Sequence, residues 1–307
     1  MLENLDPKVI AAIIAAVTSL ITFIVTQILK SPIEKRLHKF KLITDFENEQ
    51  KSKIKSVLST HKVPLIQVGE KLNGRLKNLM KNHELNWHHV NGDYVGDHYY
   101  FKSFIYRILS FLAWTKITEK SLIYLDTTIA TREDLNLIKY LKVIYRCLQF
   151  GKLTKESEDR YEKLGGDVIY RDKLDEMAIS LIKEDSQVMT YSEFKEKLNT
   201  EKDFYNPICK FLDSASPNEN RKRWDRLCCM HLSLMCFLNS YGYDFQYAEE
   251  SDFRKYIELY QRNSAFENYI ELIKRYKLED DVEIKKLIPI LEEYIKVERR
   301  KTAANKA

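Results

Sequence analysis

Residues 9–29 read VIAAIIAAVTSLITFIVTQIL, a stretch of 21 residues without a charged side chain. As an α-helix with a rise of about 1.5 Å per residue, it would be roughly 31 Å long, which matches the hydrocarbon core of a bilayer. A cleavable signal peptide has a shorter apolar region and a basic leader. The leader of this chain, MLENLDPK, is acidic. We therefore predict a transmembrane helix over residues 9–29, preceded by a short leader at residues 1–8.

The charges on either side of this segment predict its orientation. Five cations and a single acidic residue follow it closely; the cations are Lys30, Lys35, Arg36, Lys39 and Lys41. Because positive charge marks the cytoplasmic side, we expect a single-pass protein of the cell (inner) membrane with its N-terminus outside and its large C-terminal domain in the cytoplasm. The same five cations are expected to contact anionic lipid headgroups, so the lipid bilayer is the first predicted partner.

Small and hydroxyl-bearing residues recur along one face of the predicted span. They are spaced three and four apart: Ala11, Ala15, Thr18, Thr22 and Thr26. Such residues allow helix backbones to approach closely, which favours self-association of the span. The alternative is a lipid-facing helix in which each threonine bonds its own backbone. Both interpretations are compatible with the sequence.

The rest of the 307-residue chain has the composition of a helical protein. It contains only 8 Gly and 6 Pro, which argues for long helices and few tight turns. We predict a mainly α fold with one N-terminal transmembrane helix, a stalk helix and a cytoplasmic all-helical domain. The expected order after the span is a juxtamembrane stalk helix at 30–62, a helical half with an aromatic core at 63–150, a polar linker at 151–170, a second helical half at 171–300 and a disordered basic tail at 301–307.

Helix-start signals and apolar spacing place the individual helices. Ser31 and Glu34 stand at capping-box spacing before a helix that should reach about residue 61. A second helix is expected over 63–84, after Pro64, and an aromatic core helix over 99–126. Further helices are predicted at 131–149 (capped by Thr131 and Asp134), 171–184, 191–212, 217–240 (opened by a box of Ser216 and Glu219), 251–276 and 280–300. Within the 217–240 helix, Leu227, Leu234 and Leu238 should be buried.

The cysteines and the missing motifs limit which disulfide, cofactor and catalytic chemistry the chain can be expected to have. The chain has five cysteines, an odd number, and three of them, Cys228, Cys229 and Cys236, lie in one apolar stretch. This pattern indicates reduced thiols in a cytosol rather than a disulfide framework. The sequence has no phosphate-binding GxxxxGK[ST], no GxGxxG turn, no HExxH and no paired CxxC. We therefore expect no cofactor, and the sequence does not establish an enzymatic activity.

The densest polar cluster follows the 63–84 helix. It contains His83, Glu84, Trp87, His88, His89, Asp93, Asp97 and His98. Because loops on a rigid scaffold often carry function, we take His88, His89, Asp93, Asp97 and His98 as the candidate binding loop. The histidine spacings differ from the four-residue spacing that puts two imidazoles on one metal, so no transition metal is expected. The alternative is a polar loop whose histidines pack on aromatic rings or bond the backbone.

Arg226 and His231 form a second candidate. Arginine and histidine separated by four residues on a helix resemble the motif of HEPN ribonucleases, all-helical enzymes that act as pairs of subunits. The resemblance covers these six residues and implies that Arg226 would bind phosphate while His231 would act as acid and base. The polar residue that often follows the arginine in such motifs is Leu227 here.

The layout as a whole resembles that of bacterial single-pass membrane-anchored helical proteins, some of which act in phage defence. The resemblance is architectural and implies a cytoplasmic domain that senses an unidentified protein or small molecule and drives oligomerisation at the membrane. Much of the net charge of +5 lies beside the span and in the tail, which does not favour a nucleic-acid partner. The leading hypothesis is a membrane-anchored effector or scaffold; the alternative is a membrane-tethered ribonuclease.

Overall fold

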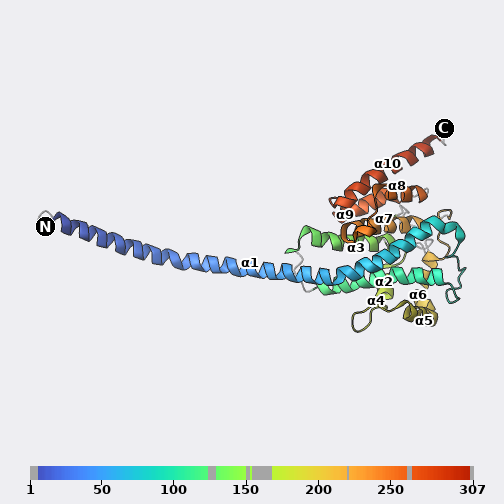
Figure 1. Cartoon of the computed structure of the whole chain (residues 1–307), viewed down its shortest axis with the longest axis horizontal. Helices are drawn as coiled ribbons and strands as arrows, with labels where there is room; N and C mark the ends of the chain where they lie inside the picture. Colours follow the sequence, from blue (N-terminus) through green and yellow to red (C-terminus); the bar gives the residue numbers. More distant parts are fainter. Residues whose placement is uncertain are drawn as a thin grey trace. The chain divides into compact units, whose positions relative to one another are not determined.

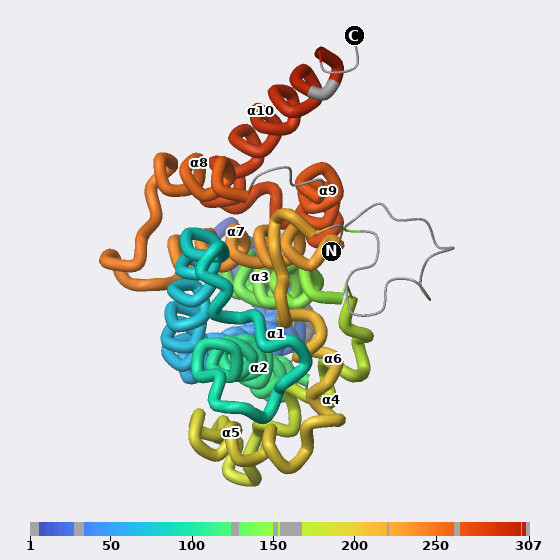
Figure 2. Tube along the Cα trace, turned by 90° about the vertical axis from the view of Figure 1, so that its right-hand side faces the viewer, coloured from blue at the N-terminus to red at the C-terminus, as the bar shows by residue number. Residues whose placement is uncertain are grey.

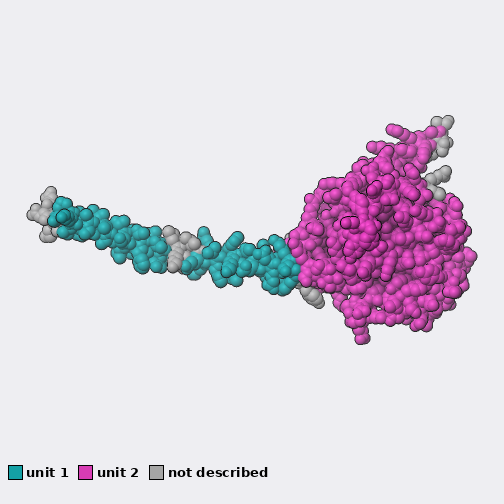
Figure 3. All heavy atoms as spheres, viewed as in Figure 1, with its two compact units in different colours: residues 1–53 teal, residues 54–307 magenta. Residues whose placement is uncertain are grey.

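The computed structural model describes residues 6–123, 129–149, 153, 168–219, 221–260 and 265–304, and the side chains within them except those of 28–33 and 302. The chain divides into two units, Met1–Lys53 and Ile54–Ala307 (Figure 3). The described residues are mainly α-helical, and their only β pairing is an isolated bridge between Ile182 and Val188 (Figure 1). The predicted fold class is confirmed.

The first helix, α1 (Pro7–Asn82), is 76 residues long and belongs to both units. It contains a 21-residue segment, Pro7–Gln27, with a mean hydropathy of 2.6. This segment is long and apolar enough to cross a membrane, and none of its apolar window is buried inside the protein. The predicted span is therefore present as a helix, with bounds shifted by two residues from 9–29.

The prediction of separate helices at 31–61 and 63–84 is wrong, because α1 is unbroken through Pro32 and Pro64. Pro64 removes one backbone donor, which costs a free helix about 3 kcal/mol. Leu58, Leu65 and Leu72 on either side of it are buried, and this burial offsets the cost. Residues 34–53 of the predicted stalk are largely exposed, including Leu37 at 64% and Phe40 at 68%.

Ten α-helices in the described residues make up the fold. After α1 they are α2 (Tyr99–Leu122), α3 (Arg132–Gln149), α4 (Arg171–Ile179), α5 (Tyr191–Thr200), α6 (Lys202–Leu212), α7 (Arg223–Tyr241), α8 (Glu250–Leu259), α9 (Phe266–Arg275) and α10 (Val282–Ala304), with short 3-10 turns η1 (His83–Leu85) and η5 (Asp244–Gln246). Within Ile54–Ala307, α5 lies at one end and α8, α9 and α10 at the other (Figure 2).

Helix α2 is the predicted aromatic core helix. Phe101, Phe104 and Phe111 are fully buried, and α2 packs against α4, α5 and α6. The expected end of this helix at residue 126 lies outside the described residues, and α2 itself ends at Leu122. Buried rings of this size each remove a large apolar area from water.

Helices α3 and α7 pack closely against each other. The predicted cap of α3 is confirmed: the Asp134 backbone N–H donates to Thr131 Oγ1 at 3.2 Å, and the Thr131 N–H donates to Asp134 Oδ2 at 3.1 Å. On α7, Leu227, Leu234 and Leu238 are buried as predicted. All five cysteines are buried, and none of them forms a disulfide bond.

Five predicted helix bounds need correction. Helix α4 ends at Ile179 rather than 184, and α7 begins at Arg223 rather than 217. The expected 191–212 helix breaks at Glu201, and the expected 251–276 helix is two helices. Helix α10 continues to Ala304, so the described part of the predicted disordered tail, residues 301–304, is helical. The two predicted halves lie in one unit, where α3 packs on α7 and α2 on α4. Most of the predicted linker, residues 154–167, lies outside the described residues.

Candidate functional site

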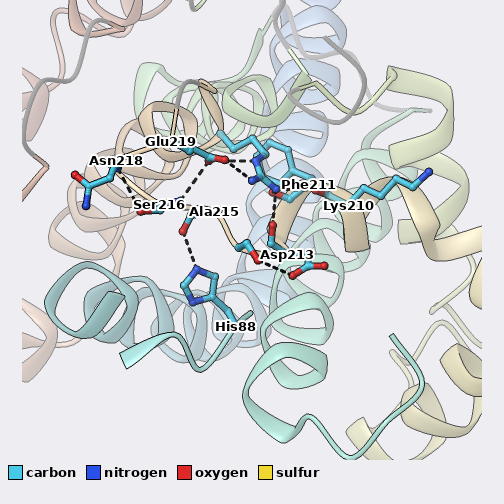
Figure 4. Close-up of polar contacts among 10 residues, drawn as sticks. His88, Lys210, Phe211, Asp213, Ala215, Ser216, Asn218 and Glu219 are labelled. Atoms are coloured by element: carbon cyan, nitrogen blue, oxygen red, sulfur yellow. Dashed lines mark hydrogen bonds and ion pairs between the residues drawn. The ribbon is translucent and has the colours of Figure 1, made fainter. Parts of the chain in front are cut away.

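Within the predicted binding loop, His88 links the loop to the segment that follows α6. This residue is buried, and its Nε2 donates to the Ala215 carbonyl at 2.7 Å (Figure 4). Burial lowers the pKa of His88 to about 4, although the bond to Ala215 opposes the shift. The ring is therefore neutral at physiological pH and ties residue 88 to residue 215.

Asp213 fixes the same loop from its other side. Its carboxylate accepts backbone N–H groups from Val90 at 3.0 Å, Asn91 at 3.3 Å and Gly92 at 2.9 Å. Burial alone would raise the pKa of Asp213, but these N–H groups and the Ser214 hydroxyl favour the charged form and lower it. The sequence analysis missed Asp213, since nothing local to it points to residues more than 100 positions away.

Arg223 holds the segment that carries Asp213. Its Nη1 donates to the carbonyls of Lys210 at 2.7 Å, Phe211 at 3.1 Å and Asp213 at 2.7 Å, and its Nη2 is paired with Glu219 (Figure 4). These carbonyls belong to the end of α6, which lacks intrahelical donors. The sequence predicted that Ser216 and Glu219 form a capping box at the start of a helix. In the structure Glu219 accepts the Ser216 N–H, as in such a box, but it also accepts Arg223 Nε–H and so positions Arg223.

The five predicted loop residues do not converge on one point. The His89 ring meets the His88 ring edge-on at 4.6 Å between centroids, whereas His98 pairs with Asp93 at 3.1 Å, and Asp97 is exposed. No three His, Cys, Asp or Glu side chains of the described residues are placed to hold a metal ion. For His88, the structure agrees with the alternative interpretation, in which the histidines bond the backbone or pack on aromatic rings. The absence of a transition metal stays a prediction.

The threonines of the predicted span face each bond their own helix. The hydroxyls of Thr18, Thr22 and Thr26 donate to the carbonyls four residues earlier, at 2.7, 2.8 and 2.7 Å. Ala11 and Ala15 are exposed on the same helix. This is the arrangement expected of a lipid-facing helix. The same residues also form a face of small side chains, and self-association through that face stays a prediction. Lys35, Arg36, Lys39 and Lys41 are exposed, while the Lys30 side chain lies outside the described set.

Arg226 and His231, the predicted ribonuclease pair, are both 0% exposed on α7. Arg226 Nη1 donates to the Cys147 carbonyl at 3.2 Å, which ties α7 to the end of α3. His231 Nδ1 lies 2.7 Å from the Tyr260 hydroxyl. Burial, with a smaller effect from the Lys77 charge, lowers the pKa of His231 to about 3. A neutral, buried ring and a buried arginine bound to backbone offer no surface to a polynucleotide.

His231 does, however, line a pocket. The pocket has a volume of about 240 Å³ and lies between α1, α7, α8 and the segment around η5. Its wall on α1 is made by Glu70, Asn73, Gly74 and Lys77, that on α7 by His231, Met235 and Leu238, and the remaining sides by Phe245, Gln246, Tyr247, Ala248, Asp252 and Tyr256. All of these residues belong to the unit Ile54–Ala307.

Specific hydrogen bonds hold the pocket walls in place. Asn239 on α7 clamps Ala248, donating to its carbonyl at 2.8 Å and accepting its N–H at 2.7 Å. Gln246 donates to Glu70 Oε2 at 2.8 Å and so fastens the η5 segment to α1. The pocket is therefore a built feature rather than a gap left by a loose loop.

Two buried polar atoms from pocket-lining residues lack hydrogen-bond partners: Asn73 Oδ1 and His231 Nε2. Tyr260, which engages the other nitrogen of His231, does not line the pocket, whereas Lys77, whose charge acts on the ring, does. Unpaired buried groups are rare in folded proteins and call for a water, an ion or a ligand.

Comparison of the chain with protein-family models, with curated proteins and with solved structures gives no match.

Sequence reasoning singled out one pocket residue, His231, and assigned it a different role. The others come from helices and a turn that are up to 186 positions apart in the chain (Glu70 to Tyr256). The one local signal was the aromatic run Tyr243, Phe245 and Tyr247 just after the end of a helix, because clustered rings in a connecting segment can mark a surface site.

Proposed function

We propose that this protein is a membrane-anchored helical effector or scaffold. In this account the Pro7–Gln27 segment spans the cell membrane, the N-terminus is outside, and the helical unit Ile54–Ala307 lies in the cytoplasm, where it senses a partner. The cations after the span contact anionic headgroups. No catalytic residue is required.

The single observation that carries the proposal is the continuity of α1. The helix that contains the exposed apolar segment also supplies buried core residues of the helical unit, among them Leu65, Leu72 and Leu76. Neither an anchor on a flexible tether nor a disposable leader requires such a helix. A change in the packing of α1 within the helical unit therefore acts on the same helix that enters the membrane.

Self-association is the second part of the proposal. A single span whose threonines are already bonded to their own backbone associates weakly. Clustering is therefore driven by the cytoplasmic unit, and the Ala11–Thr26 face lets the gathered spans pack closely. The layout resembles proteins that act in phage defence, and membrane damage on clustering is the activity we assign.

The ribonuclease alternative has no support in the described geometry. Arg226 and His231 are fully buried and bonded to Cys147 and Tyr260. Catalysis on RNA would require both groups to reach the surface. We retain it only as the outcome that would replace the effector account.

The test compares span variants with site variants in living cells. Ala15→Leu combined with Thr22→Leu should blunt growth arrest and dye entry after induction, with unchanged membrane insertion. Ala16→Leu combined with Ile24→Leu alters another face of the span and serves as the matched control. Arg226→Ala and His231→Ala should act only through loss of folded protein. Full activity of a fragment starting at residue 31, together with loss of activity in His231→Ala at unchanged protein level, would replace the effector account with the ribonuclease.

A further inference from the structure

We propose that the exposed stalk segment of α1, residues 34–53, is an interface between copies of this chain. The side chains that form it are Leu37, Phe40, Leu42, Ile43 and Phe46. The proposal deepens the proposed function, because it names a surface on which copies gather in addition to the helical unit. It rests on that function only for the span, which holds the copies parallel in one membrane.

The stalk segment exposes an unusual amount of apolar surface. The exposed fractions are 64% at Leu37, 68% at Phe40, 56% at Leu42, 48% at Ile43 and 54% at Phe46. With about 200 Å² for each large side chain, these five present about 600 Å² of apolar surface. The largest apolar patch on a typical monomer is about 300–600 Å² and often marks an interaction site. The stalk segment therefore has the surface of a helix that another molecule covers.

Most of these apolar side chains lie on one half of the helix. Leu37 is followed at intervals of three residues by Phe40, Ile43 and Phe46. Because a step of three residues turns an α-helix by about 300°, each lies about 60° from the one before, and the four cover about half of the circumference. The polar residues of the same stretch occupy the other half: His38, Lys41, Asp45 and Asn48. The apolar half is centred near Ile43.

Lipid does not cover this surface while α1 runs as one helix. Leu37 follows Gln27, the last residue of the apolar segment, by ten residues, and Phe46 follows it by nineteen. At about 1.5 Å per residue they stand about 15 and 29 Å beyond the segment, whereas the headgroup layer adds only about 5–8 Å to each side of the hydrocarbon core. A cation acts on headgroups across a Debye length of about 8 Å, but an apolar side chain is covered only by contact.

A second copy of the chain is the partner that fits this surface. Copies held by the same span run parallel, and identical residues stand at equal heights above the membrane. The apolar half of one stalk segment therefore meets the same half of the next, which is a symmetric contact. Two facing stalk segments offer about 1,200 Å² of apolar surface together, and this reaches the roughly 1,000 Å² that a specific interface requires.

The charges of the stalk segment distinguish this contact from one with lipid. Arg36 and Lys39 are exposed and share the apolar half of the helix. In parallel copies each of them faces its own like charge, so salt strengthens the contact by screening the repulsion. If the stalk segment lay on anionic lipid instead, the same cations would attract the surface and salt would weaken the contact.

The experiment measures disulfide formation between copies of the full-length protein in cell membranes under mild oxidation. The five native cysteines are buried, so the wild-type protein gives the background. Ile43→Cys, at the centre of the apolar half, should form linked dimers at least about 5-fold more than Asn48→Cys, which is exposed on the polar half. Raising the salt concentration from about 50 to about 500 mM should increase the Ile43→Cys yield by about 2-fold or more.

A second set of variants tests whether apolar surface drives the contact. In the Ile43→Cys protein, Phe40→Gln combined with Phe46→Gln should lower the dimer yield by about 5-fold or more, because two large exposed rings are removed from the interface. His38→Gln combined with Asn48→Gln changes the polar half and is the matched control, with a yield within about 2-fold of the parent protein. All four positions are exposed, so neither pair removes buried packing.

Equal dimer yields from Ile43→Cys and Asn48→Cys would overturn the proposal, because the copies would then meet only by random collision. A yield that falls as salt is raised would overturn it in favour of a stalk segment that lies on anionic lipid. Either result leaves the effector account intact, since that account is tested by span variants in cells. Conversely, dimers as expected in a protein whose span variants keep full activity would retain the interface and remove the effector account.

Discussion

At the scale of single residues, three side chains fix the loop that precedes α2. One of them, His88, lies in the loop, and the other two, Asp213 and Arg223, come from a segment much later in the chain. His88, Asp213 and Arg223 make no cluster on any helix face that the sequence displays, yet each pairs with backbone atoms of the segment opposite. Buried side-chain groups bonded to backbone stabilise a fold mainly by preventing unpaired donors and acceptors. The loop at 88–92 is therefore held by these bonds, and a binding role for its histidines stays a prediction.

The protonation of His88 predicts a pH dependence of stability. The pKa of His88 is about 4 in the folded protein because of burial, against roughly 6.5 when unfolded. The unfolded state binds more protons between these values, so the free energy of unfolding falls as the pH drops from about 6.5 towards 4. His88 alone should account for about 2 kcal/mol between pH 7.5 and about pH 5. Urea unfolding of the detergent-solubilised protein at both values measures it.

The matched controls use a second histidine. His88→Gln should lower the free energy of unfolding at neutral pH and reduce its dependence on pH, because the ring that resists protonation is gone. His38→Gln, at an exposed position of α1, should leave the free energy of unfolding at neutral pH unchanged. His231, with a folded pKa of about 3, adds its own loss over the same acidic range and remains in both variants. An identical pH profile for His88→Gln and the wild-type protein would contradict the account.

At the scale of elements, two glycines should respond to substitution in opposite directions. Gly74 lies inside α1 with open space around it, so Gly74→Ala should raise the free energy of unfolding by about 0.5–1 kcal/mol through the lower backbone entropy of alanine. Gly92 has a φ of +84° and donates its N–H to Asp213, so Gly92→Ala should lower it by about 1–2 kcal/mol. Denaturant titration of both variants separates the two; a loss in Gly74→Ala would mean that α1 is not helical there.

Local sequence signals predicted an element correctly where the hydrogen bonds and packing that the signal implies are the ones formed in the folded protein. Thr131 and Asp134 cap α3 as their spacing indicates, and the aromatic run of α2 is core. Ser216 and Glu219 have the same spacing but do not open α7, because Glu219 also binds Arg223, which in turn holds the end of α6. That competition depends on a distant helix and cannot be read from the box itself.

The same limit explains what the sequence missed in the candidate site. His231 was identified from a spacing to Arg226, but its neighbours in space are Tyr260 and the pocket wall on α1. Asn73 and Gly74 look like unremarkable surface positions of a long helix. Their importance arises only when α1, α7 and α8 are assembled, and no periodicity or motif encodes which surface positions of three helices will meet.

At the scale of the whole molecule, the account depends on the exposed apolar segment Pro7–Gln27 being inside a bilayer. No described part of the protein buries this segment, and an apolar helix of this length left in water would drive aggregation. The segment is continuous with the part of α1 that packs in the helical unit. The proposed effector function requires that the segment lie in the membrane.

The most direct measurement is the partition of the full-length protein between membranes and the soluble fraction after an alkaline wash. A fragment starting at residue 31 is the matched control. We predict that the full-length protein stays with the membranes and is released only by detergent, while the fragment is soluble, and that a C-terminal reporter is active only in the cytoplasm. Full-length protein that is soluble without detergent, or a reporter active only outside the cell, would contradict the central claim.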